Sequence, residues 1–161
     1  MSREDAVRVI AVGERARGDD GVGPAVADAL EGRGHAVRRL WGEPAEVLEA
    51  LSGAAAVVLV DAVRSGAAPG AVSVLDLAGV RLRETAGLRT SSHGLGLGEA
   101  VELARALGEL PARAALVGVE GARFEPGAGL SPAAAAAIPE AVRVVESILE
   151  RWRLGGEARD A

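Results

Sequence analysis

Ala55-Ala56-Val57-Val58-Leu59-Val60-Asp61 is a run of six aliphatic residues that ends in a carboxylate. A continuous apolar run of this length is typical of a strand covered on both faces, as in a parallel sheet between helices. The position directly after such a strand belongs to the crevice where open α/β sheets bind ligands. We therefore expect a central strand over 55–60, with Asp61 at its carboxyl end as a functional residue. The alternative is that Asp61 only stabilises the following turn through its own backbone.

The rest of the chain predicts an α/β fold around this strand. Further apolar runs predict strands over 7–12, 36–40, 71–75 and 114–119. Apolar residues at helical spacing predict helices that begin near Val22, Pro44, Leu97 and Ser131. Residues 62–70 are too few for a parallel crossover, which needs about a dozen, so strand 71–75 is expected to be antiparallel and at an edge. The fold class is therefore a three-layer sandwich around a mixed, mainly parallel five-stranded sheet.

The length of the chain fits one domain. Its 161 residues contain no internal repeat and no linker, so we expect a single domain over 1–161 with a frayed tail over 155–161. The weak strand over 36–40 carries two arginines and is expected near an edge of the sheet. The segment 76–92 is long for a structureless connection, which favours a functional role for it.

Composition excludes several classes of partner. The net charge is −5 with acids and arginines interspersed, so no basic surface for nucleic acid is expected. No apolar run approaches the roughly 20 residues that cross a bilayer, and the first residues lack a signal-peptide pattern. The chain has no cysteine, which excludes disulfides, thiolate catalysis and sulfur ligands for a metal. We therefore expect a cytoplasmic protein without a membrane partner.

All 18 basic residues are arginine, and the absence of lysine removes further mechanisms. A P-loop, a Schiff base and a Ser–Lys dyad each need a lysine. The glycine loop over 13–23 does not have the spacing of a dinucleotide fingerprint, and its two acids would repel a pyrophosphate. We expect no nucleotide ligand.

Three segments carry residues that can bind a metal. The glycine loop holds Asp19 and Asp20, Asp61 follows the central strand, and His93 precedes a helix. One aspartate of the loop can cap the helix near Val22, but one cap does not explain two acids. A lone histidine is more often structural than a ligand, yet the neighbouring serines and Gly94 favour exposure of His93. If the strands share one sheet, these groups meet at its carboxyl edge and suit a borderline divalent ion.

In order and spacing, these segments resemble the hydrogenase maturation proteases, the endopeptidases that trim nickel–iron hydrogenase large subunits. The resemblance covers about 7–152. The segments that carry it are Asp19-Asp20-Gly21-Val22-Gly23, Asp61-Ala62, Ser92-His93-Gly94-Leu95-Gly96-Leu97, Leu116-Val117-Gly118-Val119-Glu120 and Gly129-Leu130-Ser131-Pro132. The chain departs from the family pattern at two places, since Glu14 stands where Asn is usual and Gly121 where Pro is frequent.

The resemblance implies both a reaction and a site. It implies that Asp20, Asp61 and His93 are the catalytic and metal-binding residues, and that they grip a nickel ion carried by the substrate. The partner would be the nickel-loaded precursor of a hydrogenase large subunit, from which a C-terminal extension is cleaved. No Ser–His–Asp or Cys–His set is evident in the sequence, so a covalent mechanism is not expected.

Two alternatives remain at the level of the sequence. One is a catalytically silent relative that binds a metal or a partner, with Glu14 as its mark. The other is a signalling receiver domain, which also combines two acids after its first strand with an aspartate after its third. The missing lysine and the position of the acids in a glycine loop oppose the receiver domain.

Overall fold

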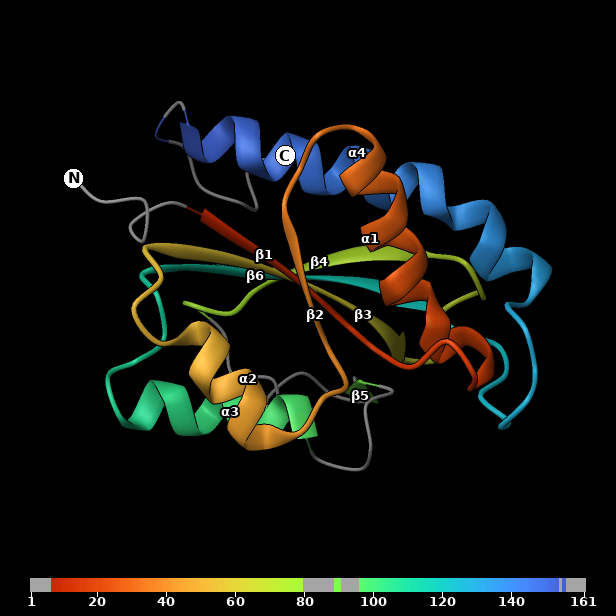
Figure 1. The fold of residues 1–161 in the computed structure, drawn as a ribbon, viewed down its shortest axis with the longest axis horizontal. Coiled ribbons are helices and arrows are strands. Elements are labelled where there is room, and N and C mark those ends of the chain that lie inside the picture. The colour runs from red at the N-terminus through yellow and green to blue at the C-terminus, as the bar shows by residue number, and fades with distance from the viewer. Residues whose placement is uncertain (1–6, 80–88, 91–95, 154, 156–161) are drawn as a thin grey trace.

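The computed structural model describes residues 7–79, 89–90, 96–153 and 155, and its centre is a mixed sheet (Figure 1). The strands of the main path have the spatial order β2-β1-β3-β6-β4. Their bounds are β1 Val7–Val12, β2 Val37–Leu40, β3 Ala56–Arg64, β4 Val72–Asp76 and β6 Arg113–Glu120. A two-residue strand, β5 (Arg89–Thr90), pairs with β3 outside this path.

The direction of the strands agrees with the prediction. Strands β2, β1, β3 and β6 are mutually parallel, whereas β4 lies antiparallel to β6 at one edge. The weak strand β2 forms the opposite edge. The short connection between β3 and β4 spans β6, because β4 pairs with β6 and not with β3. All four parallel strands therefore end at one common edge.

Helices cover both faces of the sheet, which confirms the three-layer architecture (Figure 1). On one face lie α1 (Val22–Gly32) and α4 (Pro132–Arg153), and on the other lie α2 (Pro44–Leu51) and α3 (Gly96–Ala106). Residues of β3 alternate between the two resulting cores, with Val58 and Val60 facing α1 and α4, and Val57 and Leu59 facing α2 and α3. Within the described residues, no helix is both long and apolar enough to cross a membrane.

The central strand is longer than predicted. We predicted that it ends at Val60, but β3 continues to Arg64, and Asp61 pairs with Gly118 of β6. The apolar Ala62-Val63 sustains the strand because β6 extends beside it. Asp61 is therefore a strand residue, and the alternative that it stabilises a turn is wrong. It nevertheless lies where β1 ends, since Ala11 pairs with Val60.

A strand also occurs in the segment that was expected to be a loop. Residues Thr90 and Arg89 of β5 pair antiparallel with Val63 and Arg64 of β3. Because β6 occupies the other side of β3 at this level, β5 takes the side that β1 leaves open. The consequence is that the chain returns to β3 two residues beyond Asp61.

Candidate active site

Asp20 belongs to a short 3₁₀ helix, η2 (Gly18–Gly21), between β1 and α1. Its side chain is 2% exposed, and its Oδ2 accepts the backbone N–H of Glu14 at 2.8 Å. Gly13 permits this return of the chain, since its φ is 144° and a Cβ there would overlap the backbone carbonyl of Asp20. The glycine loop thus folds around the carboxylate of Asp20 and orients it.

Asp19 has a different role, although it is adjacent in the sequence. Its fully buried carboxylate accepts the N–H groups of Ala122 at 2.7 Å and Arg123 at 3.2 Å. It also accepts both the N–H and the hydroxyl of Ser131, each at 2.7 Å. Burial raises the pKa of Asp19, but these hydrogen bonds outweigh it, so that the pKa lies below its usual value. Asp19 therefore fastens η2 to the segments after β6 and before α4.

The alternative that one of the two aspartates caps α1 is wrong. The N-cap of α1 is Gly21, and no side chain makes a capping hydrogen bond there. The 3₁₀ turn lies between the acids and the helix, and both carboxylates are directed to other backbone N–H groups. The last helix begins near Ser131 as predicted, and Ser131 caps it, because Ser131 Oγ accepts the N–H of Ala134 at 3.3 Å.

Asp61 reaches the same edge from the centre of the sheet. It is completely buried, and its Oδ1 accepts the N–H of Ala62 at 2.8 Å. The short helix η2, which carries Asp20, contacts β3, which carries Asp61. The structure thus brings the two predicted carboxylates onto contacting elements, and each has one oxygen engaged with a backbone N–H.

His93, the third predicted residue, lies outside the described residues. Among the residues that are described, no three His, Asp or Glu side chains are grouped so that they could hold a metal. The described residues closest in sequence to His93 are Thr90, which pairs with Val63 of β3, and Gly96, the first residue of α3.

Sequence analysis did not assign a role to the groups beside the end of β6. Glu120 is 5% exposed, and its carboxylate accepts the N–H of Ser65 at 3.0 Å and the Ser65 hydroxyl at 2.6 Å. An open pocket of about 490 Å³ lies next to it. The residues that line this pocket are Arg64, Glu120, Gly121, Ala122, Arg123, Phe124 and Glu125.

The ring of Phe124, which lines this pocket, explains the glycine at position 121. The Arg64 guanidinium lies 4.0 Å from the centre of the Phe124 ring, a cation–π contact. A Cβ at position 121 would overlap the same ring and would come within 3.1 Å of the Cβ of Asp19. The presence of Phe124 therefore excludes a larger residue after Glu120. This coupling has no signal in the sequence, because it depends on where one aromatic ring lies.

With the fold and these groups placed, comparison with known proteins identifies the class. The HycI family model, described as hydrogenase maturation protease, matches residues 42–148, which is more than half of the chain. Among curated proteins, no sequence matches this chain. The chain belongs to the hydrogenase maturation protease family, as its resemblance predicted.

Solved structures agree with this family. The hydrogenase maturating endopeptidase HybD from E. coli is 28% identical, with a TM-score of 0.74 over 94% of this chain and 95% of that chain. A hydrogenase 2 maturation peptidase from Thaumarchaeota archaeon SCGC_AB-539-E09 is also 28% identical, with a TM-score of 0.62 over 89% and 97%. The [NiFe] hydrogenase maturation protease HybD from Thermococcus kodakarensis shares the fold, with a TM-score of 0.76, 24% identity and coverage of 89% and 99%.

Family membership also decides against the receiver domain that the sequence left open. The match extends from the end of β2 through most of α4, so it includes β3 with Asp61 and the whole antiparallel β4. The protein is accordingly placed among proteases of hydrogenase maturation, an α/β class of hydrolases.

Proposed function

We propose that this chain is an endopeptidase that removes a C-terminal extension from the nickel-loaded precursor of a nickel–iron hydrogenase large subunit. The observation that carries the proposal is the pair of buried carboxylates, Asp20 and Asp61, on contacting elements at the carboxyl edge of the sheet in a member of this family. This edge is where open α/β sheets bind their ligands.

The chemistry of the two acids suits a divalent cation on the substrate. A buried carboxylate is unfavourable in a medium of low dielectric unless a positive charge or hydrogen bonds compensate it. The N–H groups of Glu14 and Ala62 fix the orientation of Asp20 and Asp61 and engage one oxygen of each. We propose that both carboxylates bind the nickel, and that further coordination positions are filled by the precursor's own ligands.

His93 is the proposed third ligand. An imidazole added to two carboxylates gives the mixed nitrogen and oxygen set that nickel accepts. Support comes from its neighbours in the sequence, because Thr90 pairs with β3 two residues past Asp61. The role of His93 rests on the resemblance and on this return of the chain to β3.

The proposed role of the site is recognition followed by cleavage. Binding of the carried nickel by the three side chains would bring the bond to be cut to this edge, so that only loaded precursor is processed. The hydroxyls of Ser65 and Ser131 donate to Glu120 and Asp19, and the chain has no cysteine. We propose a water molecule as the nucleophile, because no Ser–His–Asp or Cys–His set is evident in the sequence.

The test is to incubate the protein with large-subunit precursor in two forms, with and without nickel, and to follow the mass of the subunit. We expect the loaded precursor to be shortened at its C-terminus and the unloaded precursor to stay intact. Binding without any cleavage would instead support the catalytically silent relative. Equal cleavage of both forms would contradict recognition through nickel.

A further inference from the structure

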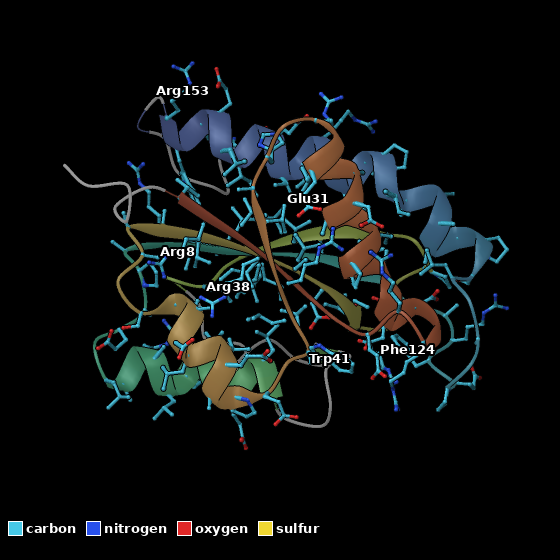
Figure 2. The ribbon with its side chains drawn as sticks, in the orientation of Figure 1. Arg8, Glu31, Arg38, Trp41, Phe124 and Arg153 are labelled. Atoms are coloured by element: carbon cyan, nitrogen blue, oxygen red, sulfur yellow. The ribbon has the colours of Figure 1, made fainter. Side chains whose placement is uncertain are left out.

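Trp41 is a large aromatic side chain exposed to solvent directly after β2 (Figure 2). It is 61% exposed, whereas the other tryptophan, Trp152, is 4% exposed in the core. Phe124, the third aromatic residue of the chain, is partly covered by the guanidinium of Arg64. Tryptophan presents a large, rigid and amphipathic contact area, and it is enriched among residues that dominate binding energy.

The backbone holds Trp41 beside the candidate active site. The carbonyl of Leu40 accepts the N–H of Gly13 at 3.0 Å, at the start of the glycine loop. The N–H of Trp41 itself donates to Glu46 at 3.2 Å. The next residue of the loop, Glu14, is the one whose N–H binds Asp20. Trp41 is thus tied through two neighbouring residues to the loop that orients a proposed ligand.

Strand order gives the separation of Trp41 from the proposed point of cleavage. Leu40 pairs with Val12 of β1, which lies level with Asp61 of β3, so Leu40 and Asp61 are two strand spacings apart, or about 10 Å. An extended peptide covers this distance in about three residues. A substrate peptide held at Asp61 and lying along the edge would therefore place a nearby side chain over the indole.

The charges around Trp41 restrict what it can bind. Glu43 and Glu46 follow it in the sequence, and Glu14 follows Gly13, whose N–H donates to the carbonyl of Leu40. The arginines of β2 are engaged elsewhere, Arg38 with Glu49 and Arg39 with Asp28 and Glu31. An acidic segment would be repelled here, whereas an apolar side chain can cover the indole without losing hydration of a charge.

We propose that Trp41 is a substrate-binding residue that contacts an apolar side chain of the precursor, about three residues from the bond that is cut. This inference rests on the proposed function. The contact contributes to binding of the peptide and takes no part in the chemical step. Trp41 therefore determines which precursor sequence the protease accepts.

Kinetics of precursor cleavage provide the first test. For Trp41→Ala we expect KM to rise about tenfold, while kcat stays within about twofold of the wild-type value. The reason is that the lost contact binds the substrate and the transition state equally well. Trp41→Phe should recover most of the affinity, since it restores an aromatic surface. Leu107→Ala is the matched control, because Leu107 is 60% exposed directly after α3 and its replacement should leave KM unchanged.

A spectroscopic test shows whether the indole itself is covered. Protein labelled with 5-fluorotryptophan has two fluorine NMR signals, from Trp41 and Trp152, which Trp41→Phe assigns. Nickel-loaded precursor should shift the Trp41 signal and leave the Trp152 signal in place. If wild-type protein cuts the precursor while the Trp41 signal and the KM of Trp41→Ala stay unchanged, Trp41 is not a binding residue and the proposed function stands. If wild-type protein does not cut loaded precursor, the proposed function is wrong and the role of Trp41 falls with it.

Discussion

The backbone N–H of Glu14 and the Oδ2 of Asp20 are 2.8 Å apart, so the residue that departs from the family pattern is anchored by a proposed ligand. Glu14 differs from the usual Asn in its side chain, but the hydrogen bond uses only its backbone. The departure therefore leaves the orientation of Asp20 intact. It adds a partly buried negative charge next to the candidate site.

Replacing Asp20 separates its structural role from its proposed chemical role. Asp20→Asn keeps an oxygen acceptor for the Glu14 N–H, and we expect an unchanged melting temperature with cleavage abolished. Asp20→Ala removes the acceptor and should also lower the free energy of unfolding by about 1 kcal/mol. Thermal unfolding and cleavage of loaded precursor measure the two effects. Normal cleavage by the folded Asp20→Asn protein would exclude Asp20 as a ligand.

Asp61→Asn tests the carboxylate at the centre of the sheet. Asn has nearly the same shape and can accept the N–H of Ala62, so the variant should melt with the wild type. The lost charge should weaken nickel and zinc binding and leave the precursor uncut. Asp76→Asn is the matched control, because Asp76 pairs with Ala115, near the start of β6 and away from the candidate site. This variant should cleave the precursor at the normal rate. Trimming at the wild-type rate by Asp61→Asn would place the catalytic centre elsewhere.

The lowered pKa of Asp19 predicts that the stability of the folded protein depends on pH. Its pKa is lowered in the folded state from 3.8, so its contribution is fully present above the pKa of the unfolded chain and is lost as pH falls through the lower, folded pKa. Asp19→Asn should lower the free energy of unfolding by about 3 kcal/mol near neutral pH, because buried N–H groups lose their acceptor. This difference should shrink below about pH 4, where the unfolded carboxyl begins to bind a proton. Urea unfolding at a series of pH values measures it, and a difference that is constant down to pH 2 would contradict the assignment.

Gly121 and Phe124 should be coupled in a double-mutant cycle. Gly121→Ala introduces a Cβ into the space of the Phe124 ring and should destabilise the protein by about 1–3 kcal/mol. Phe124→Leu should relieve most of that loss when both changes are combined, although it also removes the contact with Arg64. Chemical unfolding of the four proteins gives the coupling energy. Additive losses would show that the ring does not determine the residue at position 121.

Patterns that depend on near neighbours in the sequence predicted most of the fold. The bounds of β1 agree with the prediction and α2 begins at Pro44 as predicted, because the spacing of apolar residues marks both elements. The carboxylate of Asp61 was taken as the end of β3, whereas the strand continues because β6 pairs with it as far as Val63. Strand β5 was missed because two residues carry no periodicity, and its partner is the side of β3 that β1 leaves open.

The candidate site was predictable in position but not in the division of roles. The edge of the sheet and the acids that reach it follow from the mainly parallel direction of the strands, which the sequence indicates. The roles of Asp19 and Asp20 do not follow, because the groups that occupy Asp19 are more than a hundred residues away in Ala122, Arg123 and Ser131. The role of His93 stays a prediction.

The division between Asp19 and Asp20 bears on how functions are transferred between relatives. Two adjacent aspartates fit the same aligned column equally well, and a slip of one residue exchanges them. Such a slip would assign the metal to a carboxylate that already accepts four hydrogen bonds and holds α4 in place. A variant made on that alignment would lose activity because it is destabilised, and this loss would be misread as proof of a catalytic aspartate.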